Sequence, residues 1–153
     1  MASSRILWVV LAVVLAAGAV WMWRQAGRGP RVVHASTCDA TALSGSYGYT
    51  ITGFTIDNAG NLGFFSSAGS MVADGQGNLT GQETDVFDGQ VTRGAAITGS
   101  YTVNPDCSGS FTTNSPTAGG PFLYDFAITD SGNGMQIVEA DAGTNITGTA
   151  RKL

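Results

Sequence analysis

Short clusters of Gly, Asn and Asp interrupt the sequence at regular intervals after Cys38, and they constrain the fold more than any other feature. The clearest are DNAGN at 57–61, DGQGN at 74–78, DG at 88–89 and DSGNG at 130–134. Gly and Asn tolerate the positive φ that tight hairpin turns require. The stretches between the clusters are rich in β-branched and aromatic residues of alternating polarity, which indicates short strands joined by hairpins.

These stretches predict an all-β fold of about eight strands. The expected ranges are 43–54, 63–73, 78–87, 91–103, 108–113, 121–129, 135–140 and 144–151. Glycines recur inside the strands in phrases such as Leu-Thr-Gly and Ile-Thr-Gly, which suits a tightly curved sheet. Sequential antiparallel strands that close on themselves also leave no exposed sheet edge. We therefore expect residues 38–153 to form an antiparallel up-and-down barrel rather than a sandwich.

An uninterrupted apolar run, ILWVVLAVVLAAGAVWMW, occupies residues 6–23. It is about as long as the shortest membrane-spanning helix, and it predicts one hydrophobic helix ahead of the barrel. Cleavage after Val33-His34-Ala35 would instead make it part of a signal peptide. Residues 1–23 are thus expected to be a signal peptide or a membrane anchor, and residues 24–37 a flexible linker.

The chain is expected to act outside the cytoplasm. Three arginines after the apolar run (Arg24, Arg28 and Arg31) point the other way, because positive residues usually stay on the cytoplasmic side. The two cysteines and the Gly-, Ser-, Thr- and Asn-rich domain outweigh them. We expect a secreted or periplasmic protein, or one anchored to the inner membrane through residues 6–23.

The two cysteines, Cys38 and Cys107, predict a disulfide, because an even cysteine count in an exported chain implies pairing. The sequence has no Cys-x-x-Cys motif and no base beside either cysteine, so a structural bridge is favoured over redox chemistry. It would pin the first strand to a distant loop.

The expected domain is acidic. After residue 37 the sequence contains three basic and eleven acidic residues, which gives this part a formal charge of −8. Such a domain repels phosphate backbones, so nucleic acid is not an expected partner. The simplest explanation of the charge is solubility outside the cell.

Alternation along 91–103 places Arg93 on the buried face, and a three-residue turn at 88–90 would place Asp85 opposite it. An inward-facing Asp85–Arg93 ion pair follows from this register. Aromatic walls with a few polar groups are typical of small-molecule pockets. The candidate ligand-binding residues are Tyr47, Tyr49, Asp85, Arg93, Tyr101 and Tyr124.

The domain contains no histidine, since His34 precedes it, and this excludes Ser-His-Asp relays and His-ligated zinc. Its Asp-rich turns fit no calcium-binding loop pattern. Glu83 and Asp85 share one strand face and resemble a glycosidase acid–base pair, but cross-strand charge pairing explains them better. No catalytic residue, metal site or cofactor is predicted.

The phrases LSGSYGY at 43–49, DGQGNLTG at 74–81 and GSYTVNPDCSG at 99–109, with a DAG turn at 141–143, resemble a group of uncharacterised exported β-barrel-like proteins of soil bacteria. This resemblance implies fold and lineage but no site residues. The strand-glycine phrasing is loosely similar to calycin-type barrels, whose Gly-x-Trp start is missing here. We expect a barrel that binds a small, partly apolar ligand in its interior; the alternative is a structural or adhesive cell-envelope protein with a filled core.

Overall fold

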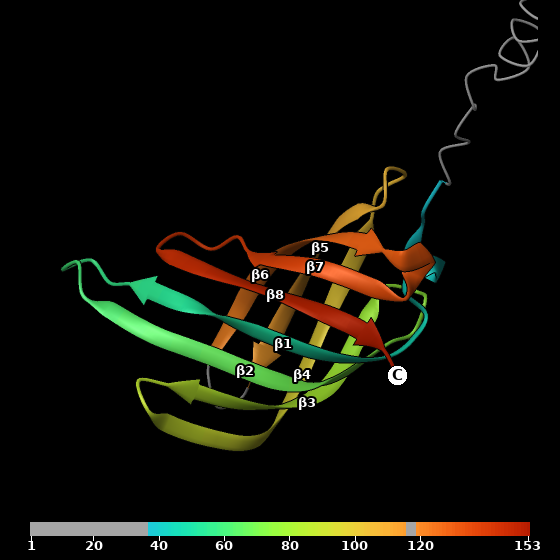
Figure 1. The fold of residues 1–153 in the computed structure, drawn as a ribbon. Coiled ribbons are helices and arrows are strands. Elements are labelled where there is room, and N and C mark those ends of the chain that lie inside the picture. The colour runs from blue at the N-terminus through green and yellow to red at the C-terminus, as the bar shows by residue number, and fades with distance from the viewer. Residues whose placement is uncertain (1–36, 116–118) are drawn as a thin grey trace, which may run out of the picture. The chain divides into compact units, whose positions relative to one another are not determined.

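The computed structural model describes residues 37–115 and 119–153, in which antiparallel strands close into a barrel (Figure 1). The strands are β1 (Gly45–Ile56), β2 (Leu62–Ala73), β3 (Asn78–Phe87), β4 (Gln90–Val103), β5 (Ser108–Ser115), β6 (Gly119–Thr129), β7 (Gly134–Glu139) and β8 (Thr144–Lys152). Each strand pairs with its neighbours in sequence, and β1 also pairs with β8. The predicted eight-stranded up-and-down barrel is confirmed.

The predicted N-terminal helix lies in residues 1–36, outside the described residues. The choice between a signal peptide and an anchor also concerns residues outside the described ranges. Of the expected linker, residues 24–37, the structure describes only Thr37. Two short 3-10 helices, η1 (Ala40–Leu43) and η2 (Asp130–Gly132), accompany the strands. Within the described ranges, no helix has both the length and the apolar character needed to cross a membrane.

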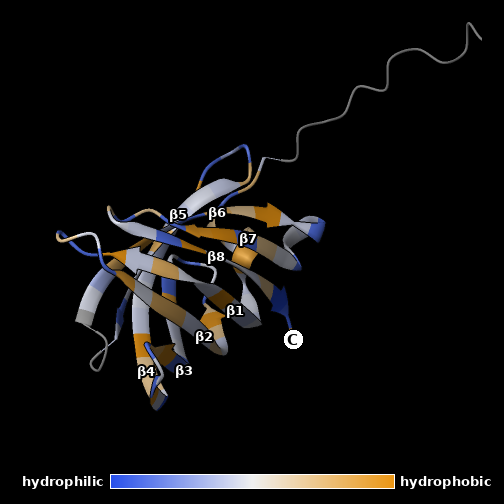
Figure 2. Cartoon of the chain, turned by 60° about the vertical axis from the view of Figure 1, so that its left-hand side comes forward, coloured by the Kyte–Doolittle hydropathy of each residue, from blue (hydrophilic) through white to orange (hydrophobic). Residues whose placement is uncertain are grey.

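Burial alternates along the strands, because successive side chains point to opposite faces of a sheet. In β1, Tyr47, Tyr49 and Ile51 are buried, whereas Thr50 and Thr52 are exposed. Figure 2 shows hydrophobic and hydrophilic positions alternating along several strands. The core takes buried apolar side chains from every strand, among them Met71, Leu79, Ile97, Phe111, Phe126, Ile137 and Ile146.

The two 3-10 helices close one end of the barrel, which we call the closed end. The Tyr101 hydroxyl donates to the Ala40 carbonyl at 2.9 Å, and the Tyr47 hydroxyl donates to the Gly132 carbonyl at 2.7 Å. Tyr47 is 0% exposed and Leu43 is 2% exposed. Both tyrosines therefore serve the packing of this end.

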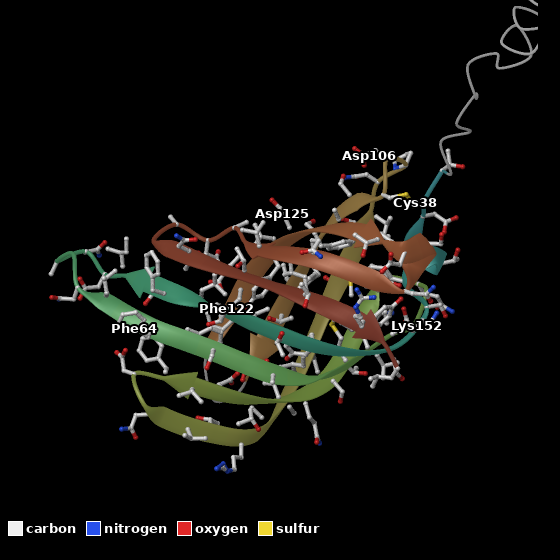
Figure 3. The ribbon with its side chains drawn as sticks, in the orientation of Figure 1. Cys38, Phe64, Asp106, Phe122, Asp125 and Lys152 are labelled. Carbon is white, nitrogen blue, oxygen red and sulfur yellow. A yellow bond between two sulfur atoms is a disulfide. The ribbon has the colours of Figure 1, made fainter. Side chains whose placement is uncertain are left out.

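A disulfide between Cys38 and Cys107 fastens the start of the domain to the turn between β4 and β5. The backbone N–H of Cys38 also donates to the carbonyl of Pro105, in the same turn, at 3.3 Å. Figure 3 shows the bridge beside the labelled Cys38. The predicted disulfide is confirmed, and it lies at the closed end.

The turn between β3 and β4 is shorter than predicted. Asp88 and Gly89 form it alone, with φ of 48° and 82°, the positive values that a two-residue hairpin turn requires. Because the turn has two residues rather than three, Asp85 lies opposite Thr92.

A β-bulge then changes which residues of β4 face the interior. Glu83 pairs with Ala95 and Thr84 pairs with Arg93, so Gly94 is an extra residue with a φ of 65°. Between the bulge and the turn the alternation is inverted, and Arg93 is exposed. The predicted inward Arg93 and its ion pair with Asp85 are therefore wrong.

Candidate ligand-binding cavity

A cavity of about 380 Å³ occupies the half of the barrel away from η1 and η2. Its walls come from the strand ends near the β1–β2, β3–β4 and β7–β8 turns, an end that we call the mouth. The lining residues are Thr55, Phe65, Glu83, Asp85, Phe87, Gln90, Thr92, Thr113, Phe122, Tyr124, Glu139 and Ile146. Phe87 is 46% exposed and also lines the cavity, so the cavity reaches the surface at the mouth.

Three carboxyl groups line this cavity. Asp85 is 6% exposed and Glu139 is 8% exposed, while Glu83 is half-buried. Ionised side chains are rarely buried without a partner of opposite charge. Among residues 37–115 and 119–153, no three His, Cys, Asp or Glu side chains come together as a metal site.

Glu83 accepts hydrogen bonds from two neighbouring strands. The Tyr49 hydroxyl donates to Glu83 Oε2 at 2.5 Å, and the Ser67 hydroxyl donates to the same oxygen at 3.2 Å. Burial raises the pKa of Glu83, and the hydrogen bonds from Tyr49 and Ser67 partly offset the rise. The charge of Asp85 and a hydrogen bond between the two carboxyl groups add to it. Burial also raises the pKa of Tyr49, so its hydroxyl stays protonated and remains a donor.

Asp85 differs from Glu83 in having no hydroxyl or N–H donor. Among the described residues neither of its carboxylate oxygens accepts a hydrogen bond from a hydroxyl or N–H group, although both are shielded from solvent, and the neighbouring Glu83 carboxyl group can donate to it only when Glu83 is protonated. Its cross-strand neighbour, Thr92, donates no hydrogen bond to it. A buried carboxylate in this state costs free energy, and a ligand with N–H or O–H groups would reduce that cost.

Glu139 has an elevated pKa. Burial raises the pKa of Glu139 to about 7, the charge of Asp141 adds to the rise, and a hydrogen bond with Tyr124 opposes it. This carboxyl group is therefore partly protonated at neutral pH. Burial also raises the pKa of Tyr124.

Aromatic side chains make much of the remaining wall. Phe65, Phe87, Phe122 and Tyr124 line the cavity, and Figure 3 shows Phe122 in the barrel interior. The Tyr124 ring stacks on Phe111, with centroids 4.8 Å apart, which holds it in place. The cavity thus combines aromatic walls with carboxyl groups, as small-molecule pockets combine apolar surface with a few polar groups.

The predicted site residues lie in different parts of the barrel. Asp85 and Tyr124 line the cavity, and Tyr49 lies behind Glu83 as its hydrogen-bond donor. Tyr47 donates to a backbone carbonyl at the closed end instead.

Two more of the predicted residues, Tyr101 and Arg93, lie away from the cavity. Tyr101 also bonds at the closed end, and Arg93 lies on the outer surface. Glu139 is absent from the predicted set, although it lines the cavity. Its place two residues after Ile137 and four after Met135, on the same face of a strand, was the signal that could have found it.

No model of a known protein family matches this sequence, and no curated protein matches it. Among solved structures, it is similar to a redesigned β-barrel, mFAP1, bound to DFHBI. That match has a TM-score of 0.47 and 21% sequence identity, and it covers 74% of this chain and 97% of that chain. The resemblance to exported proteins of soil bacteria and to calycin-type barrels stays a prediction.

Proposed function

We propose that this chain is a binding protein that holds a small, partly apolar ligand in the mouth half of its barrel, outside the cytoplasm. The observation that carries this proposal is the cavity of about 380 Å³ in the mouth half of the barrel, lined by aromatic side chains and carboxyl groups. Pockets for small molecules usually measure about 300 to 1,000 Å³ and have mainly apolar walls with a few polar groups. The aromatic walls suit an apolar ligand body.

The alternative, a structural or adhesive protein, requires a filled core. In the closed half, Leu43, Tyr47 and Met71 pack in such a core. The mouth half instead holds a cavity and the buried acids Asp85 and Glu139, which would weaken a purely structural core. This difference between the two halves favours ligand binding.

Exposed apolar side chains around the mouth support entry of an apolar ligand. Leu62, Phe64 and Phe87 are 54%, 65% and 46% exposed, and they belong to strand ends beside the β1–β2 and β3–β4 turns. Figure 3 shows Phe64 at the end of the barrel away from Cys38. Phe87 also lines the cavity, so an apolar molecule that enters there would contact this ring.

The disulfide supports a location outside the cytoplasm. Bridges such as Cys38–Cys107 form and persist in oxidising compartments and are rare in the cytosol. The acidic surface is compatible with a freely diffusing exported domain.

A neutral fluorescent probe tests the proposal. N-phenyl-1-naphthylamine emits strongly in apolar surroundings, and we expect saturable binding to the purified protein. The variant Thr92→Trp places a large ring at a cavity-lining position and should weaken binding by at least about tenfold. The matched control, Thr98→Trp, changes an exposed position of the same strand and should bind as the unaltered protein does.

Two results would contradict the proposal. One is the absence of saturable binding to the unaltered protein, and the other is equal binding by Thr92→Trp and Thr98→Trp. Native mass spectrometry of the protein purified from its host, by the mass of a co-purified molecule, would give the ligand directly.

A further inference from the structure

The buried carboxylate of Asp85 points to the chemistry of the ligand. We propose that the ligand carries a cationic head group with N–H donors, a primary ammonium, amidinium or guanidinium, which binds Asp85 inside the cavity. This inference rests on the proposed function, because it assigns a ligand class to the same cavity. It goes further by fixing the sign of the charge and the kind of donor.

The described residues supply no positive charge to the cavity. Within the described ranges the basic residues are Arg93, Arg151 and Lys152, and all three are exposed. Arg151 forms a surface ion pair with Asp130 at 3.0 Å, near the closed end. Arg93 would face the cavity in a regular strand, but the bulge at Gly94 turns it outward.

Asp85 is the acid best suited to receive such a head group. Glu83 already accepts hydrogen bonds from Tyr49 and Ser67, whereas neither oxygen of Asp85 has a hydroxyl or N–H donor, and its one carboxyl neighbour, Glu83, brings no positive charge. Two free oxygens on one carboxylate match the two parallel N–H groups of an amidinium or guanidinium. Glu139, on another wall of the cavity, adds to the negative potential.

The rest of the cavity argues for an organic cation rather than a bare ion. A volume of about 380 Å³ exceeds what one ion fills, and Phe65, Phe122 and Tyr124 cover its walls. Aromatic rings bind apolar bodies, and their faces also attract cations. A positively charged head group on an apolar body therefore fits both kinds of wall.

Three probes of nearly the same shape test the charge. Benzamidine is a cation whose amidinium group offers two parallel N–H donors to a carboxylate. Benzamide is its neutral counterpart, and benzoate is the corresponding anion. We expect benzamidine to bind the unaltered protein at least about tenfold more tightly than benzamide, because hydrogen bonds to charged groups are the stronger ones. Benzoate should not bind. Amide NMR shifts around Glu83, Asp85 and Thr92 would place the probe in the cavity.

Asp85→Asn tests the residue. This variant keeps the shape of the side chain and removes its charge, so we expect the preference for benzamidine over benzamide to fall by about tenfold or more. Asp125→Asn is the matched control, because it makes the same change on the outer face of β6 (Figure 3). Its preference should equal that of the unaltered protein.

Several outcomes would overturn the inference. Equal affinities for benzamidine, benzamide and benzoate would do so, as would an Asp85→Asn variant that keeps the full preference for benzamidine. Shifts of the same amides with calcium chloride, and none with benzamidine, would assign the acids to a metal ion instead. If N-phenyl-1-naphthylamine still binds in the cavity in these cases, the proposed function stands and the cationic head group alone is refuted. Loss of that binding too refutes both.

Discussion

The Tyr49 hydroxyl reaches the Glu83 carboxylate across a strand, passing over Gly69. Tyr49 pairs with Gly69, and Gly69 pairs with Glu83, so the three residues form one row across β1, β2 and β3. The hydroxyl donates to Glu83 Oε2 at 2.5 Å. The absence of a side chain at Gly69 leaves room for this contact inside the barrel.

Removing the donor should destabilise the protein mainly when Glu83 is ionised. We expect Tyr49→Phe to lower the free energy of unfolding by about 1 to 3 kcal/mol at about pH 8, because a buried carboxylate loses a hydrogen bond. The loss should be smaller in acid, where Glu83 is neutral. Urea unfolding at both pH values measures the difference; an equal loss at both would show that the charge of Glu83 plays no part.

Adding a methyl group at Gly69 should disturb the same row. A Cβ there would lie 2.3 Å from the Gln82 carbonyl oxygen and 2.9 Å from the Glu83 Cα, both of them backbone atoms. We expect Gly69→Ala to lower the free energy of unfolding by about 1 to 3 kcal/mol. Ser66→Ala, on the exposed face of the same strand, is the control and should change it by less than about 0.5 kcal/mol.

The raised pKa of Glu139 predicts a fall in stability as pH rises. Its pKa is about 7 in the folded protein and 4.5 for the free side chain, because burial and the charge of Asp141 outweigh the hydrogen bond from Tyr124. Since folding favours the protonated form, the penalty is absent below about pH 4.5, grows between the two values and is complete above about pH 7.

The variant Glu139→Gln should remove this penalty. We expect its free energy of unfolding to exceed that of the unaltered protein by about 1 to 3 kcal/mol at about pH 8, and to match it near pH 4. Urea titrations across this range measure the effect, with Asp125→Asn as an exposed control. A variant that is less stable at high pH would mean that the ionised form of Glu139 is stabilised by folding.

The backbone conformation at Gly94 predicts which substitutions at this position cost the most stability. Its φ of 65° is unfavourable for most residues, and an added Cβ would meet no atom within 4 Å, so backbone conformation alone sets the cost. Asn tolerates this region better than β-branched residues do. We expect Gly94→Asn to be nearly neutral and Gly94→Val to cost about 1 to 3 kcal/mol in thermal or urea unfolding. Equal costs would argue against a bulge at this position.

The disulfide should contribute to stability without contributing to binding. Cys38 and Cys107 are 69 residues apart, and opening a loop of this size costs about 2 to 4 kcal/mol in typical proteins. We expect the double variant Cys38→Ser/Cys107→Ser to unfold at lower urea concentration. Its affinity for N-phenyl-1-naphthylamine should be unchanged, because the bridge lies at the closed end; a large loss of affinity would mean that the two ends are coupled.

The sequence predicts the barrel well because period-two burial is a local signal. The alternation of Tyr47, Tyr49 and Ile51 with polar residues is visible in the sequence and persists in β1. The turn clusters likewise mark most of the hairpins. Local pattern and fold agree in these segments, so the strand ranges follow from the sequence.

The error at Arg93 has a specific cause. Strict alternation places Ala95 and Arg93 on one face, and Ala95 is indeed buried, but Gly94 is an extra residue between them and Arg93 is exposed. A glycine inside a strand is a signal of a bulge, but several strands of this chain contain glycines, and the sequence does not tell which of them shifts the phase. The cavity is also invisible in the sequence, since it depends on how side chains from different strands fill one volume.

The described chain begins and ends at the closed end, and this has a practical use. The N–H of Cys38 donates to Pro105 there, and the N–H of Leu153 donates to the carbonyl of Ser46 at the start of β1. A tag, a reporter protein or a sensor surface joined after Leu153 would thus attach at the pole opposite the entrance. In an immobilised layer of this barrel, the mouths would point away from the support and toward the solution.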